Sequence, residues 1–107
     1  MSAVTATDAA LETLLLPIDE GRIDWPAGQV LFLRARCGAA LQRHARPGLV
    51  CEQSFRPDAD LLRAAGFTLR HGEPGPFPLI LLLPPRQRSE ARALMARAAG
   101  CLAPGGR

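Results

Sequence analysis

The residues with the clearest chemical potential lie where apolar segments of the chain end. Glu52 follows one such segment, and a carboxylate at the end of a strand could bind the diol of a ribose. Gly38 is the single glycine in "RARCGAAL", where a nucleotide-binding loop carries several glycines so that the backbone can approach the ligand. Arg34 and Arg36 occupy that approach. Acidic residues are common at strand ends, and the loop has a single glycine. These residues alone therefore do not predict a bound cofactor.

A second group surrounds a rigid corner after the aliphatic run "LILLL", residues 79–83. Pro84 and Pro85 follow this run directly, and the arginines Arg86, Arg88 and Arg92 come next. A guanidinium group matches a phosphate with paired hydrogen bonds, so these arginines are candidate contacts for nucleic acid. The alternative is that they form a solvated face of the following helix.

The cysteines and histidines show no spacing typical of a metal site or a catalytic pair. Cys37, Cys51 and Cys101 are far apart, and neither His44 nor His71 lies at ligand spacing from them. We therefore expect small buried thiols in a reducing compartment, and no metal.

The charge of the chain permits a polyanionic partner without requiring one. The net charge is +3, and all 13 basic residues are arginine. Lysine, asparagine and tyrosine are all missing, which indicates a GC-rich genome and weakens an argument for RNA binding from arginine content alone. The first residues, "MSAVTATDAALETLL", have no basic segment typical of a secretory signal, so we expect a cytoplasmic protein.

Periodicity predicts an alternation of helices and strands in one domain of 107 residues. A first helix is expected at residues 8–16, capped by Thr5 or Thr7 and ended by Pro17. Strands are expected at residues 29–36, 49–55, 67–71 and 79–83. Helices are expected at residues 38–46 and 56–66. The last helix has an apolar stripe of Ala91, Leu94, Met95, Ala98 and Leu102.

This alternation predicts a parallel sheet of the Rossmann type, in the α/β class. The runs "VLFL" and "LILLL" do not alternate with polar residues, which is typical of strands covered on both faces.

The strand, the proline pair and the later "PGG" resemble class I S-adenosylmethionine-dependent methyltransferases. In members that methylate a base amine, the strand ends in Asn-Pro-Pro and an aromatic residue. Here Leu83 replaces the asparagine and Arg86 replaces the aromatic residue, so the amine-binding chemistry is missing. The order of "DAALETLLLPIDEGRIDWPAGQVLFLRARCGAAL", "CEQSFRPDADLL" and "LLLPPRQRSEARALM" resembles, over nearly the whole chain, the N-terminal half of RsmC-like enzymes, which methylate a guanine of small-subunit ribosomal RNA.

The resemblance implies a sheet of about four strands in the order 3-2-1-4, with helices on both faces. It also implies that residues 1–107 form a degenerate, non-catalytic domain within a longer two-domain protein. Gly38 and Glu52 would be vestigial cofactor positions, and Pro84 and Pro85 a vestigial corner for the target amine. The domain would need no cofactor of its own, whereas the parent enzyme would use S-adenosylmethionine. Its expected partners are ribosomal RNA and the C-terminal catalytic domain, with no membrane.

Two other functions stay open. The chain could be a stand-alone protein-interaction module, or a catalytically competent methyltransferase fragment, although the missing glycine-rich loop weighs against the latter. In the class I order another strand would pair beside residues 79–83. Without it, this apolar run is an exposed sheet edge, and we expect a tendency to form a homodimer through it.

Overall fold

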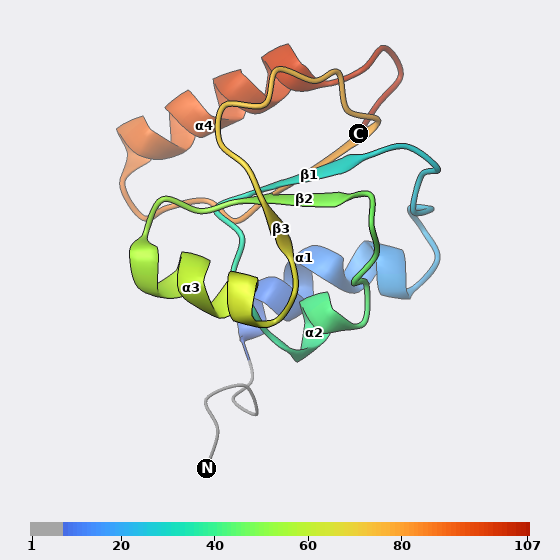
Figure 1. The fold of residues 1–107 in the computed structure, drawn as a ribbon. Helices are drawn as coiled ribbons and strands as arrows, with labels where there is room; N and C mark the ends of the chain where they lie inside the picture. Colours follow the sequence, from blue (N-terminus) through green and yellow to red (C-terminus); the bar gives the residue numbers. More distant parts are fainter. Residues whose placement is uncertain (1–7) are drawn as a thin grey trace.

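The computed structural model describes residues 8–107, which form an α/β domain: one sheet with helices on both of its faces (Figure 1). Helices and strands alternate along most of the chain, as the sequence predicts. In order they are α1 (Ala9–Asp19), β1 (Val30–Leu33), α2 (Ala39–Gln42), β2 (Leu49–Glu52), α3 (Arg56–Ala64), β3 (Thr68–Leu69), β4 (Leu79–Leu82) and α4 (Arg88–Cys101).

The four strands form one parallel sheet in the order β3-β2-β1-β4, which confirms the predicted fold class and strand order. β1 lies at the centre, with Val30 opposite Leu49 of β2 and Leu79 of β4. All three of these strands therefore begin at the same level, and their carboxyl ends meet at one edge of the sheet.

Helices cover both faces of the sheet, again as predicted. α1, α2 and α3 lie on one face and α4 crosses the other (Figure 1). Alternate residues of each strand point to opposite faces, so Phe32 and Cys51 pack toward α1–α3 while Leu31 and Val50 pack toward α4. Because β1 is buried on both faces, all four of its residues are apolar.

β4 is covered less completely than the sequence indicates. Leu79 and Leu81 are buried under α1–α3, but Ile80 and Leu82, which face α4, are only half-buried. The cause is the position of β4 at the edge of the described sheet, where α4 is the helix that covers this face (Figure 1). Met95 belongs to the predicted apolar stripe of α4, yet it is 61% exposed.

The first helix passes through Pro17, where the sequence predicts its end. Proline removes one backbone donor but fits helical dihedral angles, so the helix continues to Asp19 and closes with a bond from Glu20 N to Leu16 O (2.8 Å). The side chain of Asp8 caps the first turn by accepting from Leu11 N (3.2 Å). Thr5 and Thr7, the predicted caps, lie outside the described residues.

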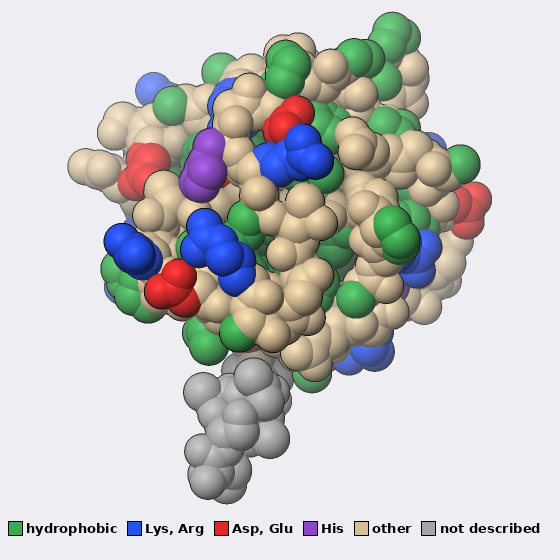
Figure 2. Space-filling model, viewed as in Figure 1, with side chains coloured by type: hydrophobic (Ala, Val, Ile, Leu, Met, Phe, Trp, Pro, Cys, Tyr) green, Lys and Arg blue, Asp and Glu red, His purple; other side chains and the backbone are tan. Residues whose placement is uncertain are grey.

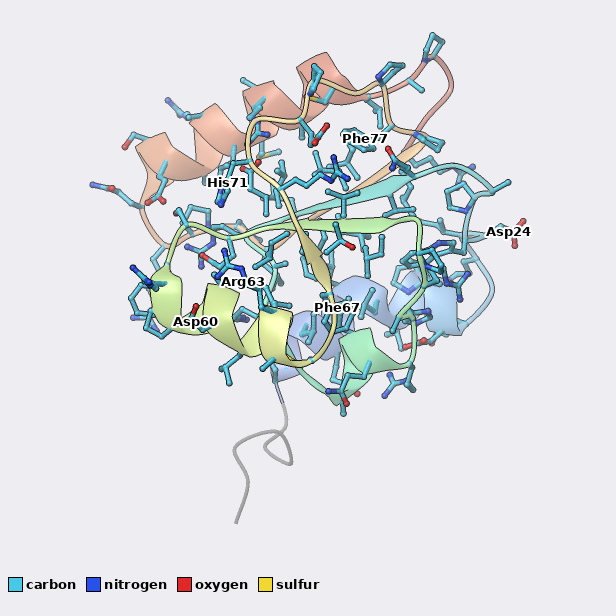
Figure 3. All side chains as sticks on the ribbon, in the orientation of Figure 1. Asp24, Asp60, Arg63, Phe67, His71 and Phe77 are labelled. Atoms are coloured by element: carbon cyan, nitrogen blue, oxygen red, sulfur yellow. The ribbon has the colours of Figure 1, made fainter. Side chains whose placement is uncertain are left out.

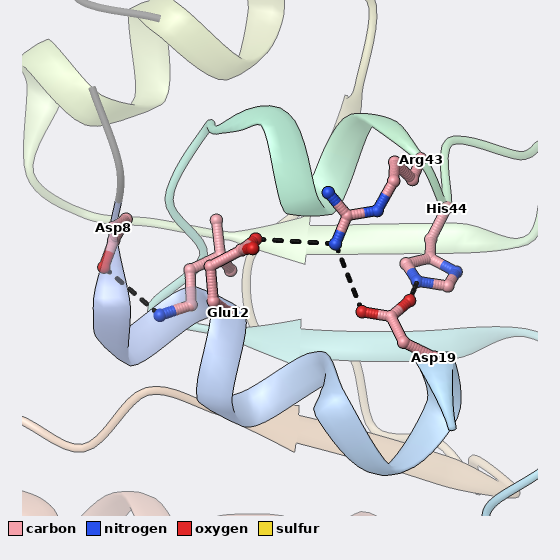
Figure 4. Close-up of polar contacts among 6 residues, drawn as sticks. Asp8, Glu12, Asp19, Arg43 and His44 are labelled. Atoms are coloured by element: carbon pink, nitrogen blue, oxygen red, sulfur yellow. Dashed lines mark hydrogen bonds and ion pairs between the residues drawn. The ribbon is translucent and has the colours of Figure 1, made fainter. Parts of the chain in front are cut away.

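A polar network joins α1 to the segment that follows α2 (Figure 4). Asp19 accepts from Arg43 (3.1 Å) and lies 2.7 Å from the His44 ring, and Arg43 also reaches Glu12. The hydrogen bonds from His44 and Arg43 hold the pKa of Asp19 below its usual range. These contacts fix α1 against the loop that leads into β2.

Candidate functional site

The carboxyl ends of β1, β2 and β4 form the edge where ligands bind in open α/β sheets. Gly38 lies at this edge as the residue before α2, with an extended backbone. A Cβ atom built there would lie 2.8 Å from a methyl carbon of Leu11, so the glycine allows α1 to pack closely. The space that a glycine leaves for a ligand in cofactor-binding loops is filled here by a side chain of the same domain.

Glu52 ends β2 as predicted, but its carboxylate is already engaged. Arg97 of α4 forms a two-point ion pair with it, and Gly72 N donates to Oε1 (3.1 Å). The Glu52 side chain is only 14% exposed. Burial by itself would raise the pKa of Glu52, but the Arg97 guanidinium and the Gly72 amide hold that pKa below its usual value. The carboxylate is thus ionised and fully occupied.

Arg34 lies between the carboxyl ends of the neighbouring strands β1 and β4. From β1 the sheet is extended by β2 and β3 on one side and by β4 on the other. Arg34 ends β1 in the left-handed backbone region, with φ of 55°. Its Nε donates to the carbonyl of Leu83 (3.0 Å), which ties the two strand ends together. Arg36, the other arginine of this segment, pairs with Asp8 at 3.0 Å. Both arginines therefore make structural contacts at the edge where a ligand would enter.

The two prolines that follow β4 differ in their exposure: Pro85 is buried in the domain, whereas Pro84 is exposed. Arg86, Arg88 and Arg92 are all exposed, Arg88 as the first residue of α4. Within residues 8–107 none of the three has an ion-pair partner, so they remain available to solvent or to a polyanion.

The cysteines are free thiols without catalytic geometry. Cys51 and Cys101 are buried, Cys37 is half-buried, and burial raises the pKa of the Cys51 thiol to about 12. A thiol with so high a pKa is a poor nucleophile at neutral pH. Among the described residues no group of three or more His, Cys, Asp or Glu side chains could hold a metal ion.

A polar cavity that the sequence does not predict lies beside the N-terminus of α3. It has a volume of about 320 Å³ and is lined by Gln53, Ser54, Arg56, Ala59, Arg63 and His71. Figure 2 shows a histidine and several arginines gathered on the face over α3, and Figure 3 labels His71 and Arg63 among them. No local sequence pattern indicates this cavity, because His71 and Arg56 are distant in the chain and the turn at Phe55 lies within the strand predicted at residues 49–55.

The open side of β4 is bordered by apolar hollows on both faces of the sheet. One, of about 440 Å³, lies between α1 and the end of β4, and the other, of about 220 Å³, lies between α4 and β4. Arg107 pairs with the start of this edge, because its carbonyl accepts from Ile80 N (2.8 Å) and its amide donates to Pro78 O (3.1 Å). The chain's own last residue therefore covers part of the edge.

No helix within residues 8–107 has the length and apolar character needed to cross a membrane. Comparison of the chain with protein-family models and with curated proteins finds no match in either set.

Proposed function

We propose that this chain is a non-catalytic methyltransferase-like domain, the N-terminal part of an RsmC-like enzyme that methylates a guanine of small-subunit ribosomal RNA. Its role is to support docking of the RNA and to hold the C-terminal catalytic domain, in the cytoplasm. The parent enzyme would use S-adenosylmethionine, and this domain would bind no cofactor. The strand order 3-2-1-4 and the near-complete span of the sequence resemblance support this assignment.

One observation carries the non-catalytic part of the proposal. The positions at this edge where a cofactor would be expected are occupied by the domain's own side chains: Arg34 bridges β1 to β4, and Arg97 occupies Glu52. Leu11 fills the space beside Gly38. These contacts within the domain leave neither the Glu52 carboxylate nor the space beside Gly38 free for a cofactor.

The first test is titration of the chain with S-adenosylmethionine in a calorimeter. We expect no saturable heat at hundreds of micromolar cofactor. An Arg97→Met variant frees the Glu52 carboxylate and should also fail to bind, because Leu11 and Arg34 still fill the edge. Saturable binding by the unaltered chain would refute the non-catalytic assignment.

The tandem arrangement is tested by the reading frame beyond Arg107. A following domain with a glycine-rich loop and Asn-Pro-Pro at a strand end would support the proposal. A stop codon directly after Arg107 would contradict it and leave the interaction module as the better explanation.

A second candidate function, a protein-interaction module, is favoured by the hollows beside β4. A strand added to this edge would place alternate side chains in the two apolar hollows while its backbone bonds to β4. A second copy of the chain could supply that strand, which would give the homodimer expected from the sequence.

We expect sedimentation analysis to show a concentration-dependent dimer of the chain, because an apolar edge strand is a template for pairing. Leu82→Lys should make the chain monomeric by placing a charge at this edge. Leu61→Lys is the matched control, since Leu61 is an exposed leucine of α3 and its replacement should leave the dimer intact. A monomer at all concentrations, with slow amide exchange at residues 79–83, would show that Arg107 and its neighbours cover the edge.

A further inference from the structure

The cavity beside α3 has the shape and donors of an anion site. Its volume of about 320 Å³ would hold a phosphate group with room to spare. The guanidinium groups of Arg56 and Arg63, the His71 ring and the Ser54 hydroxyl line it from two directions, because His71 follows β3 whereas the others belong to α3 or the turn before it. All four residues are exposed, so a ligand can reach them without a conformational change.

A buried glutamine holds the turn that carries these groups. Gln53 is 7% exposed, its Nε2 donates to the carbonyl of Ala35 (2.8 Å), and its Oε1 accepts from the amide of Phe55 (2.9 Å). Both ends of the Gln53 side chain are therefore fixed to backbone. The turn from Ser54 to Arg56 is ordered before any ligand arrives, which reduces the entropy cost of binding.

The carboxylates near the cavity leave its positive charge largely available. Glu52 is neutralised by Arg97, and Arg56 has no ion-pair partner among the described residues. Arg63 contacts Asp60 at 3.2 Å, but the two side chains are 59% and 60% exposed, and such surface pairs are weak. A phosphate can therefore compete for Arg63, while Asp58 lies half-buried in the first turn of α3 and does not line the cavity.

An exposed aromatic ring lies within the same turn. Phe55 is 61% exposed, between Ser54 and Arg56, both of which line the cavity. Leaving a phenylalanine ring in water costs free energy that a stacked nucleobase would recover. The Phe55 ring does not line the cavity, but it lies on the turn that carries the cationic side chains. Exposed aromatic rings combined with positive charge are what proteins use to bind single-stranded nucleic acid.

We propose that this surface, Ser54, Phe55, Arg56, Arg63 and His71, binds single-stranded RNA: the cavity holds a backbone phosphate, and a neighbouring unpaired base stacks on Phe55. This inference rests on the proposed function and names the RNA-contacting surface, which differs from the Arg86, Arg88 and Arg92 face expected from the sequence. A single strand is required because bases within a duplex cannot lie flat on a side chain.

The test is a fluorescence-anisotropy titration of the chain with a labelled oligouridine of about eight nucleotides, at several salt concentrations. We expect the double variant Arg56→Gln/Arg63→Gln to weaken binding about tenfold and to reduce the log–log salt slope by about 0.7, as the loss of one phosphate contact on a single strand would require. The matched control Arg88→Gln/Arg92→Gln removes the same charge from α4 and should weaken binding no more than about twofold, the effect of net charge alone.

Phe55→Leu separates stacking from charge. It should weaken RNA binding about tenfold without changing the salt slope, and should leave the binding of inorganic polyphosphate unchanged. Equal losses in the two arginine double variants, or an unaffected Phe55→Leu variant, would overturn the site. If only Arg88→Gln/Arg92→Gln weakens binding, this site is wrong while the proposed RNA-docking function stands through α4. If the unaltered chain binds no RNA, both the site and RNA docking are wrong.

Discussion

Replacement of Gly75 by alanine is expected to lower the free energy of unfolding by about 2–4 kcal/mol. Gly75 has φ of +84°, in the left-handed region that side chains disfavour, and a Cβ atom there would lie 2.5 Å from the carbonyl oxygen of Cys101. This oxygen accepts from Phe77 N (2.8 Å) at the end of α4, so the overlap would push the helix end away from the loop before β4. Urea denaturation of the two proteins measures the difference.

Gly72 is the matched control for this substitution. It lies in the same loop with φ of +69°, but a Cβ atom there would meet nothing within 4 Å. Gly72→Ala should therefore cost only the backbone preference, about 1 kcal/mol. Equal losses for the two variants would show that the loop is not held tightly against α4.

Replacement of Glu52 by glutamine is expected to lower the free energy of unfolding by about 1–2 kcal/mol at pH 7. The substitution keeps the shape of the side chain but leaves Arg97, which is 30% exposed, facing a neutral amide. Asp60→Asn is the control, because the exposed pair between Asp60 and Arg63 should contribute less than about 0.5 kcal/mol. A double-mutant cycle with Arg97→Met isolates the energy of the pair from other effects of each substitution.

The contribution of Glu52 should also depend on pH. Its pKa is lowered in the folded protein from its ordinary value of 4.5, so the unfolded chain takes up the proton first as the pH falls. The difference between the original chain and Glu52→Gln should stay constant above about pH 5 and shrink below about pH 4.5. A difference that persists at pH 3 would mean that shape, and not charge, makes Glu52 stabilising.

The second of these predictions concerns a residue that is a candidate cofactor position in the sequence. The contacts of Glu52 give its carboxylate a structural role at the end of β2. Glu52 connects the sheet to α4, which covers one face of the sheet within residues 8–107, and it also accepts from the Gly72 amide. The substitution therefore measures how much this carboxylate contributes to the stability of the fold.

The sequence alone determined the architecture of this protein. The apolar runs "VLFL" and "LILLL", separated by helical patterns and turn residues, require strands buried in a parallel sheet, and the structure confirms the sheet, its order and helices on both faces. Strand ends were less well defined. The strand at Val30 was expected to reach Arg36, but it ends at Leu33 because Arg34 adopts a left-handed backbone and directs its side chain toward Leu83 O.

Only the tertiary structure decided what the charged residues do. Glu52 and Arg97 are 45 positions apart in the chain, so no local pattern links them, and Arg97 was not among the predicted site residues. The same holds for the cavity of Arg56, Arg63 and His71, which forms because parallel pairing of β2 with β3 brings His71 to the level of the α3 N-terminus. Hydrophobic periodicity is a local property of the chain and can be read from it, whereas the pairing of charges depends on which strands become neighbours.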